Sequence, residues 1–492
     1  MKKNHLMTLP KLCAVALLGA TTFLASCAVD GFNNDERWES SVSNSQLYSP
    51  TADVITIAPD ASGENQIISW PVVLGASKYE CKLLDVTDPD NPKLVYEGLV
   101  DGCSLKAARE DDAMYEFYIR TLANTSKGNI DAEETTKLAY NTMIPTYKTI
   151  PSGTDLYAYF ASEVIPENET DPVTKQLIPI AYDLEPDGEY TMSQSLNLGY
   201  HYVMLRTLNK KNHAKIALSN EANFIISYDF SLNYVDVDAS ATTKAVMEAF
   251  NYETEPSDYL KKPGNYYLIN YLRLMGCSFK GVAGSLFFDN NKPYGVVTFL
   301  IQNSIIEMNT QTDKIRNEAF ISFQGGGVKD FTMKNSTVYQ VGTGNSKYFL
   351  RYNNSVRVDR LGWTKGDHTT ITYGNNTFYK VASGNWSNYS GLADYSAYDL
   401  QNNIWYDCSE KGDIARRIMG NGRLGNNSTF YSANNTYWHN GAAVDQGNYD
   451  TSSSQLTTDP AFTDPSNGNF TPTGTEQLQK RTGDPRWLPA EN

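Results

Sequence analysis

The sequence predicts an all-β protein in which an N-terminal β-sandwich is followed by a right-handed parallel β-helix. Short runs of alternating apolar and polar residues, separated by turn residues, extend over about residues 51–146. An imperfect repeat of paired small polar residues, each pair followed by β-branched or aromatic residues, extends over about residues 150–470. With 33 Tyr and 19 Phe among 492 residues, the chain has enough bulky side chains to fill both cores.

The chain is acidic, with a formal net charge of −15. Residues 1–26 contain three lysines and no acidic residue, so the rest carries 38 basic against 56 acidic residues, a net −18. Such a surface repels nucleic acid unless a local basic patch overrides it. The composition therefore disfavours a DNA or RNA partner, and it names no other ligand.

The N-terminus is typical of an export signal. Three lysines precede an apolar run over residues 12–24, which is too short to span a bilayer as a helix. The run ends in Leu24-Ala25-Ser26-Cys27, which resembles the bacterial lipobox; the resemblance implies cleavage of residues 1–26 and lipidation of Cys27. The polar residues 27–50 form a flexible tether on this interpretation. We therefore expect an exported, lipid-anchored protein of the outer membrane and cell surface.

The first module, residues 51–146, is expected to be an antiparallel sandwich. Its alternating runs occupy residues 54–57, 66–70, 78–83, 94–96 and 115–119. Trp70, Gly75-Ala76, Tyr79 and the later Tyr115-x-Phe117-x-Ile119 resemble a fibronectin type III domain, and the resemblance implies a spacer rather than a ligand-binding module.

Four cysteines follow Cys27. Cys81 and Cys103 lie within the first module and could form a disulfide or remain thiols, and both alternatives stay open. Cys277 and Cys408 occupy positions typical of a solenoid core, so we expect buried free thiols there.

The second module, residues 150–470, repeats a string of small polar residues followed by a strand. The third positions of six such strings are residues 278, 304, 337, 377, 404 and 436. In a parallel solenoid each turn places its strand about 4.8 Å from the one below, so equivalent side chains stack. Asn suits the bend between two sheets because its amide can donate to, and accept from, the Asn of the next turn. The repeat therefore predicts a column of aligned polar corners, and stacking explains the Asn-x-Ser/Thr strings better than glycosylation does.

Taken together, the chain resembles a group of Bacteroidetes lipoproteins with a fibronectin-like module and a pectin-lyase-like right-handed β-helix of the kind seen in chondroitinase B. Residues 459–470 and 483–487 also carry this resemblance, and residues 471–492 are expected to form a C-terminal cap or tail. The resemblance implies a polysaccharide partner at the cell surface, with other glycan-uptake proteins as further partners. It assigns no reaction.

A β-helix that cleaves acidic polysaccharide by β-elimination needs a cation to neutralise the uronate carboxylate and a base to remove the α-proton. Two basic segments, taken as insertions into turns two repeats apart, could supply both groups on one flank. The catalytic candidates drawn from them are Lys347, Arg351, Arg357 and Arg417. The pair Asp236 and Asp238 is a weaker alternative for a hydrolase, because two carboxylates must face each other across a sugar.

No cofactor is expected. The histidines lack zinc-ligand spacing, and the glycine run at residues 325–327 marks a tight bend rather than a phosphate loop. A calcium ion bridging an acidic sugar to Asp or Glu remains open, and the sequence gives it no position.

Exposed aromatic rings would instead favour sugar binding, and the candidates are Trp363, Trp386 and Tyr389. Trp405 and Trp438 follow the repeat directly and are expected in the core. The favoured hypothesis is a surface lipoprotein that binds polysaccharide on the β-helix flank for glycan harvesting. A polysaccharide lyase and a structural or protein-docking solenoid are the alternatives.

Overall fold

The computed structural model describes residues 42–60, 65–110, 112–172, 175–249, 260–261, 266–310, 319–352, 369–389, 396–419 and 428–490. The predicted signal segment and Cys27 lie outside this set. Two compact units divide the chain: residues 1–144 with 170–176, and residues 145–169 with 177–492. No helix among the described residues is long and apolar enough to cross a membrane.

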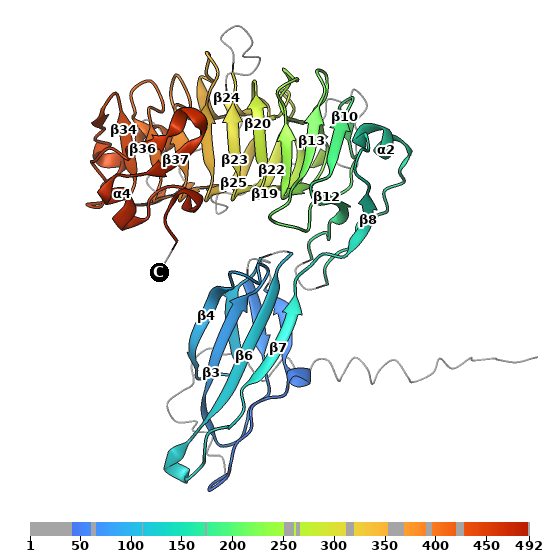
Figure 1. Cartoon of the computed structure of the whole chain (residues 1–492), viewed down its shortest axis with the longest axis vertical. Helices are drawn as coiled ribbons and strands as arrows, with labels where there is room; N and C mark the ends of the chain where they lie inside the picture. Colours follow the sequence, from blue (N-terminus) through green and yellow to red (C-terminus); the bar gives the residue numbers. More distant parts are fainter. Residues whose placement is uncertain are drawn as a thin grey trace, which may run out of the picture. The chain divides into compact units, whose positions relative to one another are not determined.

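The first unit is an antiparallel β-sandwich, which confirms the predicted architecture (Figure 1). One sheet has the order β1 (Thr56–Pro59), β2 (Asn65–Ser69), β5 (Ser104–Ala108). The other has the order β4 (Lys93–Val100), β3 (Ala76–Asp85), β6 (Met114–Ala123), β7 (Thr136–Asn141). The short 3-10 turns are η1 (Ala52–Val54) and η2 (Thr125–Lys127).

Alternation along these strands directs Trp70, Tyr79 and Phe117 into the core between the sheets, where the Trp70 and Tyr79 rings lie 5.3 Å apart. Cys81 lies in the same core, and burial raises the pKa of its thiol to about 12. Cys81 and Cys103 are both thiols and do not form a disulfide with each other.

The second unit is a parallel β-helix with three sheets (Figure 1), and most turns pass through them in the order I, II, III. Sheet I contains β8 (Thr146–Ile150), β9 (Ile180–Leu184), β12 (Val203–Arg206), β15 (Phe230–Asn233), β19 (Tyr266–Met275), β22 (Tyr294–Gln302), β25 (Gly327–Lys334), β28 (Thr369–Gly374), β31 (Ser396–Gln401) and β33 (Thr429–Ala433), with β18 (Leu260–Lys261) antiparallel to β19. Sheet II contains β10 (Glu189–Met192), β13 (Ala214–Leu218), β16 (Val235–Asp238), β20 (Ser278–Val282), β23 (Ile305–Met308), β26 (Thr337–Gln340), β29 (Thr377–Tyr379), β32 (Ile404–Tyr406), β34 (Thr436–His439) and the antiparallel β35 (Ala442–Ala443). Sheet III contains β11 (Leu196–Asn197), β14 (Phe224–Ile226), β17 (Met247–Ala249), β21 (Phe287–Phe288), β24 (Ala319–Phe323), β27 (Tyr348–Tyr352) and β30 (Ser387–Tyr389).

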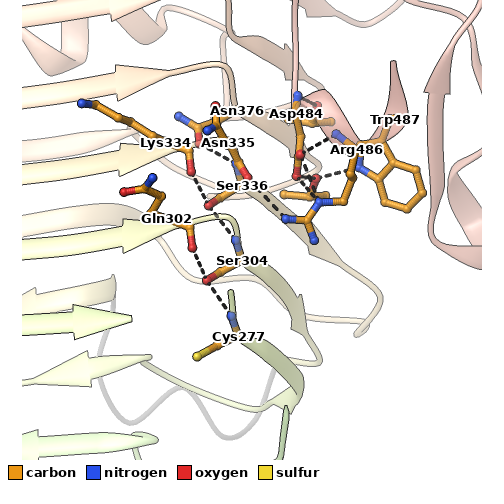
Figure 2. A network of polar contacts seen from close by, with 12 residues as sticks. Cys277, Gln302, Ser304, Lys334, Asn335, Ser336, Asn376, Asp484, Arg486 and Trp487 are labelled. Atoms are coloured by element: carbon orange, nitrogen blue, oxygen red, sulfur yellow. Dashed lines mark hydrogen bonds and ion pairs between the residues drawn. The ribbon is translucent and has the colours of Figure 1, made fainter. Parts of the chain in front are cut away.

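The corner between sheets I and II holds the predicted column of polar residues (Figure 2). The first corner residue has positive φ in turn after turn, a conformation that Gly and Asn tolerate best: Gly276, Asn303, Asn335, Asn375, Asn402 and Asn434. The second corner residue is buried and stacks on its equivalents: Cys277, Ser304, Ser336, Asn376, Asn403 and Asn435. Each backbone N–H in this column, from Cys277 to Asn403, donates to the side-chain oxygen of the next turn at 3.1 to 3.2 Å.

One register assignment was wrong. The sequence pattern placed Ser304 beside residues 278 and 337, whereas Ile305 pairs with Ser278 and Thr337. Ser304 belongs one position earlier, because its hydroxyl fills the corner column and donates to the Gln302 carbonyl at 2.9 Å.

The interior of the β-helix is filled by stacked side chains of equivalent positions. On sheet II the ring of Trp405 lies 5.5 Å from that of Phe378 and 5.2 Å from that of Tyr437, with near-parallel planes. Cys277 and Cys408 are buried free thiols as expected, and burial raises the pKa of both. The helix α2 (Leu156–Ser162) buries Leu156 and Phe160 against the first turns.

The C-terminal segment folds back over the outer face of sheet II, and we call residues 459–490 the strap. It contains β36 (Phe462–Asp464), η6 (Pro465–Asn467), β37 (Asn469–Pro472), α4 (Thr475–Lys480) and η7 (Pro485–Trp487). The expected cap, residues 471–492, is therefore the second half of a longer element.

Side-chain contacts fix the strap to the solenoid. Phe470 packs on Tyr339 and Tyr379, with ring centroids 5.0 and 5.5 Å apart. Thr337 Oγ1 donates to the Asp484 carboxylate at 2.8 Å and accepts from Trp487 Nε1 at 2.8 Å (Figure 2). The strap therefore occupies the outer face of sheet II over the last turns.

Candidate functional site

The lengths of the connections distinguish one side of the β-helix from the others. The corner between sheets I and II takes two residues in most turns. The connections that lead into or out of sheet III, or take its place, are much longer in several turns: residues 250–265, 309–318, 353–368 and 407–428. Long connections on a rigid scaffold are where binding residues are usually carried. We therefore expect a binding site on the side of sheet III.

One column of side chains on sheet III points outward. Its members pair in register from turn to turn, and they alternate with the core residues Phe287, Ile321 and Leu350. The column consists of Glu248, Phe288, Ser322, Arg351 and Asn388. The Ser322 side chain is buried, and its hydroxyl has no hydrogen-bond partner among the described residues.

Two of the predicted cationic residues meet at β27, the strand next to the C-terminal end of this sheet. Lys347 Nζ lies 5.5 Å, and the Arg351 guanidinium 5.6 Å, from the centroid of the Tyr348 ring. Both distances fall within the range of cation–π attraction. Tyr348 itself is buried, Arg351 is half-buried and Lys347 is exposed. Arg351 was expected in an insertion, whereas it lies within the regular strand β27, because residues 348–352 complete the turn.

The second basic segment reaches the same flank. At the corner that leads into sheet III, Gly384 N donates to the Lys347 carbonyl at 3.0 Å, and Glu410 N donates to the Gly384 carbonyl at 2.7 Å. These bonds stack three consecutive turns, so Lys347 and Lys411 lie on one edge, two turns apart. The described residues of the two predicted segments therefore lie on one flank.

We define the basic flank as residues 342–352, 380–389 and 407–419. It contains six basic residues, which are Lys347, Arg351, Lys380, Lys411, Arg416 and Arg417. It contains three acidic residues, which are Asp407, Glu410 and Asp413. The flank therefore carries a net +3 on a chain of net charge −15.

Arg417 lies on α3 (Ile414–Ile418), which packs beside β30 where a further strand of sheet III would follow. Its Nε donates to Asp413 Oδ2 at 2.9 Å, and both side chains are largely buried. This pair ties α3 to the turn before it. Arg417 is accordingly better suited to holding the flank than to acting as a base, and Arg357 lies outside the described residues.

The aromatic candidates fare differently. Trp386 was expected in an exposed loop, but it is fully buried and stacks on Phe349 at 4.3 Å with an interplanar angle of 6°. The expectation was wrong because Trp386 lies at the corner leading into β30, where its ring fills the interior. Trp363 lies outside the described residues. Tyr389 ends β30, and its side chain is likewise outside the description.

Trp405 is in the core as expected, whereas Trp438 is half-buried in the outward row of sheet II.

The carboxylates do not form a hydrolytic pair. Asp236 and Asp238 share one face of β16, but Asp236 Oδ1 lies 2.9 Å from His213 Nδ1, and Asp238 accepts from Ser240 N at 2.9 Å. Among the described residues, no group of three or more His, Cys, Asp or Glu could hold a metal ion.

A buried carboxylate instead has a structural role at the end of sheet III. Asp289 Oδ2 accepts from the backbone N–H groups of Gln324, Gly325 and Gly326 at 2.6 to 2.8 Å. A side chain at residue 326 would collide with the Tyr294 carbonyl, so the glycine run forms the expected tight bend. Burial raises the pKa of Asp289 to about 6, although the backbone donors act against that shift.

Three family models match successive parts of the chain, and all are described as domains of unknown function. They cover residues 1–187 (DUF4992), 188–341 (DUF4957) and 371–487 (DUF5123). Residues 342–370, which carry Lys347 and Arg351, fall between the second and third models. No curated protein matches the chain.

Two solved structures are similar to it at low scores. One is the pectate lyase PelI from Erwinia chrysanthemi in complex with tetragalacturonic acid, with 9% identity, a TM-score of 0.14, and coverage of 65% of this chain and 87% of that chain. The other is a pectate lyase from Pectobacterium carotovorum, with 10% identity, a TM-score of 0.17, and coverage of 70% and 90%. The β-helix itself is defined by the strand registers given above.

Proposed function

We propose that this protein binds an acidic polysaccharide along the basic flank. The observation that carries the proposal is the convergence of Lys347 and Arg351 on the ring of Tyr348. Two cations held at one ring form a defined cationic point on an otherwise acidic molecule, and a like charge on the rest of the surface repels anions that do not fit it. The basic flank is therefore selective for a carboxylated or sulfated ligand that can reach along it.

The geometry of the solenoid suits a chain-like ligand. Successive turns lie about 4.8 Å apart, so the flank presents backbone and side-chain groups at a regular spacing along the helix axis. Arg351 is half-buried, and a guanidinium removed from water makes stronger charge-assisted hydrogen bonds to a carboxylate or sulfate than an exposed one. Asn388 pairs with Arg351 in register and adds an amide donor on the next turn.

The proposal includes the cellular setting. Acylation of Cys27 would anchor the chain to the outer membrane, and the β-sandwich would act as a spacer that holds the β-helix away from the lipid, next to other glycan-uptake proteins. Mass spectrometry of the protein purified from detergent tests the anchor. A mass without acyl groups, or one unchanged by Cys27→Ala, would contradict it.

Affinity electrophoresis in gels that contain polygalacturonate, chondroitin sulfate or neutral dextran tests the binding function. Retardation is expected in at least one acidic gel and not in dextran. Lys347→Gln and Arg351→Gln should each weaken binding about tenfold, since each removes one charge-assisted contact. Lys215→Gln is the matched control, because Lys215 is an exposed lysine on sheet II and not on the flank. Retardation by no acidic glycan, or an equal loss with Lys215→Gln, would refute the assignment.

A polysaccharide lyase is the second candidate, favoured by the same convergence of two cations. In β-elimination Arg351 would neutralise the uronate carboxylate while Lys347, in its neutral form, takes the proton from C5. A C4–C5 double bond then forms, and the C4–O bond breaks as the departing oxygen takes up a proton. Ultraviolet absorbance of the unsaturated product distinguishes the two functions. Absorbance growth that disappears in Lys347→Gln would establish the lyase, and its absence with binding intact would leave the binding function alone.

A further inference from the structure

The end of the β-sandwich where the described chain begins carries exposed apolar side chains. Val72, Leu74 and Ile130 are 65%, 62% and 59% exposed. Val42, the first described residue, lies among them, because its carbonyl accepts from Asn129 Nδ2 at 3.0 Å and its Cγ1 would lie 3.1 Å from a Cβ placed on Gly75. Leu74 and Ile130 are the chain neighbours of Gly75 and Asn129. We call Val42, Val72, Leu74 and Ile130 the apolar tip.

The apolar tip lies at the opposite end of the sandwich from the point where the chain leaves for the second unit. The Gly75 carbonyl accepts from Asn124 N at 2.9 Å, next to Ala123, where β6 ends. The last strand, β7, finishes at Asn141 beside Met114, where β6 begins. The two ends are about 30 Å apart, since β6 has ten residues.

We infer that the apolar tip rests on the lipid bilayer when the chain is anchored, an inference that depends on the proposed acylation of Cys27. Fourteen residues, 28–41, separate Cys27 from Val42. A polar tether of that length, as the sequence predicts, would have a root-mean-square span of about 20 Å, so this end of the sandwich would be the first folded surface that the membrane meets. Moving aliphatic side chains from water to the lipid boundary is favourable, by a free energy proportional to the area removed from water.

A second copy of the chain fits the apolar tip less well. Stable protein interfaces bury about 800 Å² on each partner, which needs 20 or more residues, whereas the tip offers four apolar side chains. A bilayer needs no shape complementarity. A second, weak membrane contact would also increase the membrane affinity that an acyl chain provides, because stable anchoring generally takes two signals.

The test places an environment-sensitive fluorophore at the tip. Leu74→Cys and Leu94→Cys, each in a Cys103→Ser background, are labelled with a nitrobenzoxadiazole probe. Leu94 is the matched control: it is 58% exposed and lies on β4 opposite Leu84, toward the other end of the sandwich. The chain from residue 28 carries an N-terminal histidine tag and is captured on phosphatidylethanolamine–phosphatidylglycerol vesicles that contain a nickel-chelating lipid.

On capture, the probe at residue 74 should shift to the blue and be quenched by a spin label in the lipid, whereas the probe at residue 94 should do neither. Ile130→Asp should abolish the shift at residue 74 while the near-ultraviolet circular dichroism stays unchanged. Equal responses at the two positions, or no response at residue 74, would overturn the inference. A shift that grows with protein concentration without vesicles would assign the tip to self-association instead. Because the tag replaces the acyl chain, a failure of the Cys27 assignment leaves this result readable.

Discussion

The two kinds of corner in each turn of the β-helix differ in almost every physical respect. Between sheets I and II the corner takes two residues, its second residue is buried, and its polar groups bond from turn to turn. Around sheet III the connections vary in length up to the 22 residues, 407–428, between β32 and β33. The uniform corner fixes the stacking of the turns. The variable corners have no such column of buried side chains, and the basic flank lies on their side of the β-helix.

The largest expected effect comes from breaking the uniform corner. Asn403 Nδ2 donates to the Tyr373 carbonyl at 2.8 Å, and its Oδ1 accepts from Asn376 N at 3.1 Å. Asn403→Ala leaves several buried groups without partners, at about 1 to 3 kcal/mol each, so the free energy of unfolding should fall by about 5 kcal/mol. Urea denaturation followed by circular dichroism measures it.

Asn303→Gly is the control at the same corner. Asn303 has a φ of 52°, which glycine adopts without strain, and we expect its replacement to change the free energy of unfolding by less than about 0.5 kcal/mol. Equal losses in the two variants would mean that the buried amides do not hold the turns in register.

Much of this contrast could be read from the sequence, because it depends on local patterns. The pattern of a small polar residue followed by Asn or Ser, and then by a strand, recurs often enough to predict the corner column. A single sequence does not fix the pairing to one residue, which is why Ser304 was placed beside Thr337 instead of Ser336. The polar neighbours of Trp386 suggested a loop, and only the stacking of Phe349 beneath it shows that its ring is buried.

The strap could not be predicted, because its contacts join residues far apart in the chain. Trp487 and Thr337 are separated by 150 positions. The motifs over residues 459–470 and 483–487 were visible, but nothing local says which face they cover. The site was limited in the same way. The basic residues could be identified in the sequence, but the position of Lys347 and Arg351 beside the Tyr348 ring depends on the register of β27.

The strap should give the next largest effect. Phe470 is fully buried against Tyr339, Tyr379 and Phe462. Phe470→Ala removes these contacts and leaves a cavity, and we expect a loss of about 4 kcal/mol in the free energy of unfolding. Tyr431→Ala is the control on an exposed aromatic of sheet I, with little change expected. A loss below that of the control would mean that the strap is not part of the cooperative fold.

A pH dependence should follow from Asp289, which holds the bend after sheet III. Its folded pKa is about 6, above the ordinary 3.8, so its contribution to stability is full below about pH 3.8 and is lost as the pH rises through 6. Relative to Asp289→Asn, the native chain should lose up to about 3 kcal/mol between pH 4 and pH 7. Thermal unfolding of both proteins across this range measures the difference.

Asp464 should show a pH dependence of stability opposite to that of Asp289. Hydrogen bonds from the side chains of Asn467 and Ser466 lower the pKa of its exposed carboxyl group. Relative to Asp464→Asn, the native chain should therefore gain stability as the pH rises. Parallel slopes for the two aspartates would contradict the account of the buried bend.

The smallest effect on stability should come from the basic flank itself. Lys347 is exposed, and an exposed charge contributes about 0 to 1 kcal/mol, so Lys347→Gln should leave the midpoint of urea unfolding nearly unchanged. The same substitution is expected to weaken binding to an acidic glycan about tenfold, which separates the two kinds of corner by function. Asn403→Ala should show the reverse pattern, with a large loss of stability and unchanged binding by the molecules that stay folded, because the buried Asn403 lies outside the basic flank. A large loss of stability in Lys347→Gln would place this lysine among the residues that hold the turns together. It would contradict the assignment of stability to the uniform corner and of binding to the basic flank.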